Sequence, residues 1–125
     1  MEFQELTNSE KVVMKCIWMG DHHMVLPEVL QLVNDNFAKN WKSQTASTFL
    51  KHLVQKGYLN MYREGKLYKY EPLVREEDYA AHLLKQHIDF WNNGDIKKFA
   101  NSLHKEETLS KEELHELKGM LDNFE

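Results

Sequence analysis

The sequence predicts a mainly α-helical protein that contains one β-hairpin. Only five Gly and two Pro occur in 125 residues, which leaves room for few turns. Apolar residues recur at the spacing of amphipathic helices both before residue 57 and after residue 76. Between these regions, the aromatic-rich segments 58–62 and 67–71 have the composition of strands. The predicted order is therefore three helices, a hairpin and three further helices.

The first two helices are predicted from their start signals and their apolar stripes. Thr7 and Glu10 have the spacing of a capping box, and Gly20 ends the helix that follows them. Pro27 occupies a favoured first-turn position of the second helix. Residues 22–25, between the two helices, are expected to form a short extended connector. The inward residues are Val13, Met14, Ile17 and Trp18 in the first helix, and Leu26, Val29, Leu30, Val33 and Phe37 in the second.

The third helix, over residues 43–56, carries an apolar stripe opposite a small polar face. The stripe consists of Ala46, Phe49, Leu50, Leu53 and Val54, and the polar face of Gln44, Ser47, Thr48, Lys51 and Gln55. Ser43 or a neighbour is the expected N-cap, and Gly57 stands where a helix ends in a left-handed residue. A helix with a buried back and a short polar front suits insertion into a DNA groove. Taken alone, the pattern also fits an ordinary amphipathic surface helix.

Residues 63–66 form a Gly-containing turn between the two β-prone segments, and Pro72 ends the second segment. Three helices followed by a hairpin with a basic tip have the plan of a winged helix-turn-helix domain. In that plan the second and third helices are the helix-turn-helix, and residues 58–71 are the wing. A hairpin in this place also suits a purely structural role, as an edge ribbon that closes the core.

Positive charge is concentrated in and just after the third helix. Residues 39–69 hold seven Lys or Arg against one acidic residue, whereas the whole chain has a net charge of −4. Such a local excess suits contact with phosphates, although charge runs also form ordinary solvated surfaces. The residues expected to contact bases or phosphates are Lys42, Ser43, Gln44, Thr45, Ser47, Thr48, Lys51, His52, Arg63 and Lys66.

Residues 74–125 are expected to form a helical dimerisation domain that follows a winged-helix domain of residues 1–73. Asp95 is the expected N-cap of its second helix, and Ser110 with Glu113 forms a capping box at the third. These helices have more apolar surface than the N-terminal domain can bury by itself. They are expected either to pack on that domain as one unit or to pair with a second copy. The expected dimer contacts are Leu83, Leu84, Trp91, Phe99, Leu103, Leu114, Leu117, Leu121 and Phe124.

Several classes of function find no support in the sequence. No Gly-rich phosphate loop, activated nucleophile or paired carboxylate indicates an enzyme, and no cofactor is expected. The seven His, of which His82 and His87 are five apart, do not have the spacing of a metal site. The single Cys16 and the lack of a signal peptide or an apolar run of membrane-spanning length favour a cytoplasmic protein without membrane contact.

The joint pattern resembles the family of penicillinase and methicillin-resistance repressors and the related copper-responsive repressors of Gram-positive bacteria. The resemblance covers nearly the whole chain. In the N-terminal half it rests on Ser9-Glu10, Val12-Val13-Met14, Ile17-Trp18, Trp41, Thr45, Thr48, Leu50, Leu53, Lys56-Gly57, Leu67-Tyr68 and Tyr70. In the C-terminal half it rests on Gly94-Asp95, Ser110, Glu112-Glu113-Leu114 and Glu116-Leu117.

The resemblance implies a homodimeric transcriptional repressor that binds a palindromic operator with TACA/TGTA-type half-sites. The third helix has His52 where the family usually has Arg, and it carries Gln44 and Ser47 where relatives often have basic residues. Copper-responsive members end in a cysteine cluster, which this chain lacks. In β-lactam-responsive members a sensor protease cuts an Asn-Phe bond, and the aligned bond here is Ser102-Leu103. A protein-interaction module and a His-based metal-responsive regulator are the alternatives.

Overall fold

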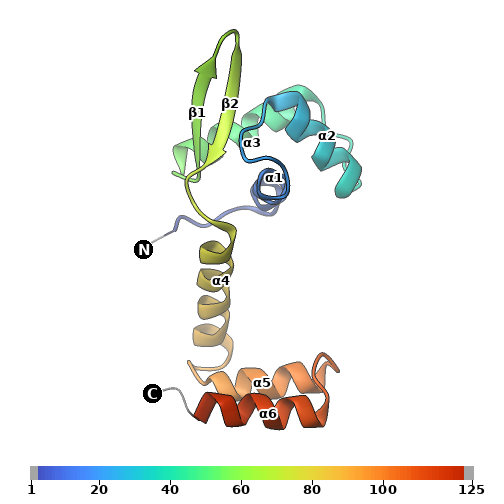
Figure 1. The fold of residues 1–125 in the computed structure, drawn as a ribbon, viewed down its shortest axis with the longest axis vertical. Coiled ribbons are helices and arrows are strands. Elements are labelled where there is room, and N and C mark those ends of the chain that lie inside the picture. The colour runs from blue at the N-terminus through green and yellow to red at the C-terminus, as the bar shows by residue number, and fades with distance from the viewer. Residues whose placement is uncertain (1–2, 123–125) are drawn as a thin grey trace. The chain divides into compact units, whose positions relative to one another are not determined.

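The computed structural model describes residues 3–122, and it confirms the predicted mainly helical class with a hairpin after three helices (Figure 1). In order, the elements are α1 (Asn8–Met19), α2 (Leu26–Asn36), α3 (Ser43–Gln55), β1 (Leu59–Glu64), β2 (Leu67–Pro72), α4 (Glu76–Trp91), α5 (Ile96–Lys105) and α6 (Lys111–Asp122). The chain forms two compact units, Met1–Tyr79 and Ala80–Glu125, so the first turn of α4 belongs to the first unit.

The core of the first unit lies between α1, α2, α3 and the base of the hairpin. The apolar stripes predicted for the three helices supply it, because residues three and four apart share one helix face. Its fully buried side chains include Val13, Met14, Ile17, Val29, Val33, Ala46, Leu50, Leu53, Tyr58 and Leu59. Cys16 is buried among them.

The ends of α1 and α3 follow local signals. The Thr7 hydroxyl accepts from the Glu10 N–H at 3.2 Å, and the Glu10 carboxylate accepts from the Thr7 N–H at 2.8 Å, which confirms the capping box. Of the two expected positions for the N-cap of α3, Ser43 or a neighbour, the structure has the neighbour Lys42, which makes no side-chain hydrogen bond, and Ser43 is the first helical residue. At the other end Gly57 has φ +82°, as predicted, and the Tyr58 N–H closes the helix on the Leu53 carbonyl at 3.0 Å.

The hairpin has longer strands and a tighter turn than the sequence suggested. Glu64 pairs with Leu67, so only Gly65 and Lys66 form the turn, and Gly65 has φ +63°. A positive φ at the first of two turn residues is the geometry that twists with the strands and that Gly adopts without strain. Met24 forms a β-bridge with Tyr70, which confirms an extended residue in the 22–25 connector and ties it to the second strand. In Figure 1 the hairpin stands beside α1–α3 with its turn at the free end.

The link between the hairpin and α4 is fixed to α1. The Trp18 indole N–H donates to the Val74 carbonyl at 2.9 Å, and Lys15 forms an ion pair with Glu76. Tyr79 is buried, and its ring lies 5.6 Å from the ring of Tyr58 and 5.9 Å from that of Trp18. The first unit therefore extends through residue 79.

In the second unit α5 and α6 lie side by side (Figure 1). The Asp95 carboxylate accepts from the N–H groups of Lys97 and Lys98, and Ser110 and Glu113 form both bonds of a capping box, as predicted. Ile88 and Ala100 are buried. Phe90 and Trp91, whose rings lie 4.7 Å apart, are 73% and 69% exposed, so a large aromatic surface has no cover within this unit.

Within residues 3–122, no helix combines the length and the apolar character needed to cross a membrane.

Candidate nucleic-acid interface

The outer face of α3 offers a row of short polar groups and one cation. Gln44, Ser47, Thr48 and Lys51 are exposed, while Ala46, Leu50 and Leu53 on the opposite face are buried. Ser43 is exposed at the start of the helix, and Thr45 is half-buried. The Thr48 hydroxyl donates to the Gln44 carbonyl at 3.0 Å, which leaves its oxygen free to accept a hydrogen bond. This face can both donate to and accept from base edges at close range.

The first turn of α3 is suited to an oxyanion such as a phosphate. Lys42 is exposed and makes no capping hydrogen bond, so its side chain does not compete for the first N–H groups of the helix. Those N–H groups and the positive end of the helix dipole favour a negative ligand. The lack of a side-chain cap, which the sequence did not predict, thus fits a DNA-facing helix end.

The turn before α3 is fixed by Asn34 of α2, a residue that the sequence analysis did not single out. Its side-chain amide donates to the Trp41 carbonyl at 3.1 Å, and its oxygen accepts from the Trp41 N–H at 2.9 Å. The Trp41 ring packs on Phe49, with centroids 5.0 Å apart. This bidentate contact sets the position of α3 on α2. A helical Asn seven residues before a Trp gives no sequence signal of such a contact.

His52 is placed differently from the other predicted contact residues, because it faces a buried carboxylate of α1. Glu10 is 2% exposed, its Oε1 lies 2.6 Å from Lys56 Nζ, and its Oε2 lies 3.5 Å from His52 Nδ1. Burial alone raises the pKa of Glu10, but the hydrogen bond and charge of Lys56 and the hydrogen bonds of Thr7 outweigh it and hold the pKa below 4.5. The Lys56 ammonium also donates to the Glu5 carbonyl at 2.8 Å. Glu10 therefore fixes α3 to α1.

The hairpin tip carries two of the predicted cations, Arg63 and Lys66, and both are exposed. The Arg63 guanidinium carbon lies 5.7 Å from the centroid of the Tyr68 ring, and its Nε donates to the Gly65 carbonyl at 3.1 Å. Lys69 is paired instead with Glu64 at 3.2 Å, and this contact raises the pKa of Lys69.

Lys56 pairs with Glu10 and Lys69 pairs with Glu64, so these two lysines add little to the positive charge that is available to DNA. Seven basic residues lie between residues 39 and 69, and removing these two leaves five. The five, which form no ion pair within the described chain, are Lys39, Lys42, Lys51, Arg63 and Lys66.

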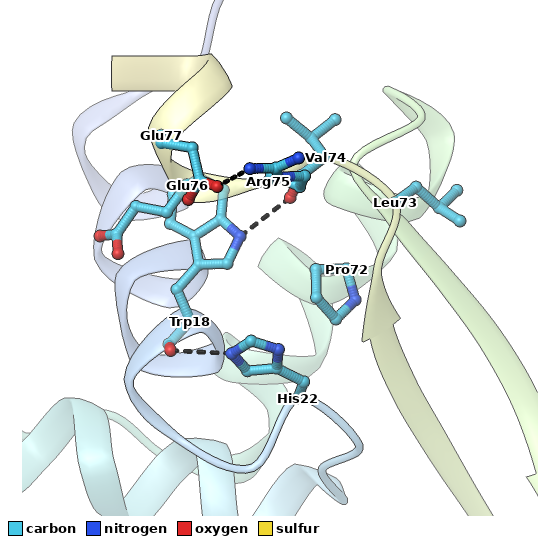
Figure 2. A pocket seen from close by; sticks show the side chains of 8 residues that line it. All are labelled: Trp18, His22, Pro72, Leu73, Val74, Arg75, Glu76 and Glu77. Atoms are coloured by element: carbon cyan, nitrogen blue, oxygen red, sulfur yellow. Dashed lines mark hydrogen bonds and ion pairs between the residues drawn. The ribbon is translucent and has the colours of Figure 1, made fainter. Parts of the chain in front are cut away.

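A surface pocket of about 360 Å³ lies where the hairpin meets α4 (Figure 2). The polar groups that line it already have partners. The Trp18 indole donates a hydrogen bond to the Val74 carbonyl, the His22 ring lies 3.0 Å from the Trp18 carbonyl, and Arg75 forms an ion pair with Glu77. Because these groups bond to one another rather than into the pocket, it does not have the features of a ligand site. In the described part of the chain, no three His, Cys, Asp or Glu side chains come together in an arrangement that could hold a metal ion.

The residues predicted for dimerisation differ in exposure within the second unit. Leu84 and Trp91 are exposed, whereas Leu83, Phe99, Leu103, Leu114 and Leu117 are half-buried. The side chain of Leu121 and residue Phe124 lie outside the described part. Ile88 is buried, and the centroid of the neighbouring His87 ring lies 5.8 Å from that of Phe99.

Comparison with known proteins agrees with this architecture. A solution structure of the DNA-binding domain of the repressor BlaI is similar with a TM-score of 0.53 and 31% identity, over 62% of this chain and 92% of that chain. The Bacillus licheniformis BlaI monomeric form in complex with the blaP half-operator is similar with a TM-score of 0.52 and 31% identity, with the same coverage.

Relatives match over nearly the full length. The penicillinase repressor of Bacillus licheniformis is 29% identical over 118 residues, which cover 94% of this chain and 90% of the relative. The methicillin resistance regulatory protein MecI of Staphylococcus aureus (strain N315) is 26% identical over 121 residues, which cover 94% of this chain and 94% of the relative. The model of the penicillinase repressor family matches residues 6–123. The relatives are repressors rather than enzymes. The chain belongs to the penicillinase repressor family.

Proposed function

We propose that the protein represses transcription by binding a palindromic operator as a homodimer, with α3 in the major groove and the hairpin on the adjoining DNA. The observation that carries the proposal is the outer face of α3, where four exposed side chains able to hydrogen-bond stand opposite the buried Ala46, Leu50 and Leu53. The similarity to a repressor solved in complex with a half-operator supports DNA binding by this unit.

The side chains divide into base-reading and phosphate-binding groups. Gln44, Ser47 and Thr48 are short and exposed, so they suit hydrogen bonds to base edges in TACA/TGTA-type half-sites. Phosphate contacts are assigned to Ser43, Thr45 and the cations Lys42, Lys51, Arg63 and Lys66, which would fix the register of the protein on the duplex. His52 is assigned no base or phosphate contact in this scheme, because its Nδ1 lies 3.5 Å from the buried carboxylate of Glu10.

Dimerisation is assigned to the second unit. Its exposed apolar side chains include Leu84, Phe90, Trp91, Ile96 and Met120. Exposed apolar side chains in this number are typical of protein interfaces. Two copies joined through it would present two α3 helices to half-sites about one DNA turn apart.

Release of the repressor by a sensor protease would take place at the bond aligned with the cleavage site of β-lactam-responsive members. The bond between Ser102 and Leu103 lies within α5, and the Ser102 hydroxyl donates to the Lys98 carbonyl at 3.2 Å. Cleavage there would require this part of α5 to open, because a protease acts on transiently opened backbone. Limited proteolysis with and without operator DNA would measure how often it opens.

The experiment that tests the proposed function is selection of duplexes from a random pool by the purified full-length protein. We expect enrichment of an inverted repeat, and a sedimenting species of two chains. A fragment of residues 1–79, which retains Val74 and Tyr79, should sediment as a monomer and bind the selected duplex more weakly. Recovery of no common sequence would contradict operator recognition, and a dimeric fragment would contradict the assignment of the dimer interface.

A further inference from the structure

The two faces of the hairpin differ in what they expose. In an antiparallel pair, residues opposite one another and residues two apart share a face. Leu59, Met61 and Arg63 of β1 therefore share a face with their partners Pro72, Tyr70 and Tyr68 of β2. At the base of this face Leu59 and Tyr70 are buried in the core, whereas toward the tip Met61 and Tyr68 are 45% and 52% exposed. The outer part, formed by Met61, Arg63 and Tyr68, is named here the Arg63 face.

The opposite face of the hairpin is already occupied by its own polar contacts. Lys69 pairs with Glu64, and Asn60 donates to Glu71 at 2.8 Å. Tyr62 is held by the imidazole of His23 at 2.8 Å. Groups that satisfy one another in this way have little to offer a partner. Leu67 is 56% exposed on this face but is apolar, so the polar groups that are free to bind a partner lie on the Arg63 face.

The guanidinium of Arg63 is held in place while part of it stays free. It lies over the Tyr68 ring, and its Nε donates to the Gly65 carbonyl. Within the described chain, no acceptor contacts its two Nη groups. A cation fixed by a ring and a carbonyl loses less conformational entropy when it binds a partner.

The reach of the hairpin matches the spacing of DNA grooves. From Leu59 to Glu64 the strand makes five steps of about 3.4 Å, or roughly 17 Å. One turn of DNA is about 34–36 Å, so a major groove and the next minor groove are about half of that apart along the axis. A hairpin of this length is therefore long enough to extend from a major groove to the adjoining minor groove.

We infer that the Arg63 face binds the minor groove next to the half-site and favours A·T pairs there. This inference rests on the proposed function. Narrow A·T-rich minor grooves have a strong negative potential that attracts Arg, and G·C pairs place an amino group on the groove floor. The exposed Tyr68 ring and Met61 suit the apolar sugar walls of the groove. Arg63 would thus contribute to sequence preference beyond a phosphate contact.

The test uses the full-length protein and the selected duplex with three versions of the base pairs just outside the half-sites. These pairs are A·T, G·C or I·C, because inosine keeps the major-groove edge of guanine but lacks its minor-groove amino group. We expect the A·T and I·C duplexes to bind roughly fivefold or more tightly than the G·C duplex. Arg63→Lys, which keeps the charge but not the planar fork, and Tyr68→Ala should both remove this preference.

Lys66→Gln is the matched control at the same tip. It should weaken binding to all three duplexes alike and leave the preference intact. Equal binding of the three duplexes by the wild type, or I·C behaving like G·C, would overturn the inference while leaving the proposed function standing. A preference that survives both Arg63→Lys and Tyr68→Ala would overturn it as well. Failure of the wild type to discriminate any selected duplex from random DNA would overturn the proposed function and the inference together.

Discussion

Replacing Lys56 with Met should destabilise the first unit by about 3 kcal/mol, because it leaves the Glu10 carboxylate buried without its main counter-charge. Removing one partner of a buried ion pair costs about 3–5 kcal/mol. The Lys56 side chain is 24% exposed, so we expect the lower end of this range. Met keeps most of the aliphatic stem, which limits the packing loss. The Thr7 N–H still binds Glu10 in the variant, which prevents a larger effect.

The effect should depend on pH in a defined direction. The folded pKa of Glu10 lies below 4.5, so its contribution to stability is present above pH 4.5 and is lost as the pH falls through the folded pKa. Without Lys56, burial acts with less opposition and raises the pKa of Glu10. The difference in unfolding free energy between wild type and Lys56→Met should therefore shrink as the pH falls from the raised pKa of Glu10 in the variant to its lowered pKa in the wild type.

Urea unfolding of the full-length protein measures this difference. In a Trp91→Phe background, fluorescence reports on Trp18 and Trp41 of the first unit. Lys51→Met is the matched control, since Lys51 is an exposed lysine on the same helix, and it should change stability by less than about 0.5 kcal/mol. In the Glu10→Gln and Lys56→Met double variant the two losses should not add. If Lys56→Met cost no more than Lys51→Met, the account of Glu10 as the link between α1 and α3 would be refuted.

Three further predictions concern the DNA interface and the core. Lys51→Met should weaken binding to all duplexes and reduce the slope of log affinity against log salt by about 0.9, measured by titration at several salt concentrations; an unchanged slope would remove Lys51 from the phosphate contacts. Thr48→Ala should change the ranking of half-site variants in a competition assay, whereas a uniform loss for all variants would indicate a phosphate or structural role. Burial raises the pKa of Cys16 to about 11, so iodoacetamide should label the folded protein at pH 8 far more slowly than the protein in urea; equal rates would show that the thiol is accessible.

The sequence predicted the features that depend on residues close together in the chain. The capping boxes at Thr7 and Ser110 and the left-handed Gly57 need only three or four neighbouring residues, so composition and spacing were enough. The turn of the hairpin was predicted over residues 63–66, whereas Glu64 already pairs with Leu67. The content of Gly, Lys and Glu does not determine which two residues form the last pair before the turn. The N-cap of α3 was predicted only as Ser43 or a neighbour, and it is Lys42, because a cap without a side-chain hydrogen bond leaves no signal in the sequence.

Contacts between distant residues could not be predicted from spacing. The pairing of Glu10 with Lys56 and the bond from Trp18 to Val74 each join α1 to a segment more than 40 residues later. The sequence could count Lys56 as a cation but could not show that a buried carboxylate neutralises it. Periodicity likewise does not separate a helix face that packs inside its own unit, such as Ile88, from one left exposed, such as Trp91.

The central claim is that α3 and the hairpin form one DNA-binding surface, and charge reversal at both places tests it most directly. Lys51 and Arg63 are exposed and form no ion pairs in the described chain, so Lys51→Glu with Arg63→Glu should leave the melting temperature nearly unchanged. Fluorescence anisotropy with the selected duplex at about 0.15 M salt should show a loss of affinity of at least about a hundredfold. A double variant that folds and binds the duplex as tightly as the wild type would contradict the placement of DNA on this surface.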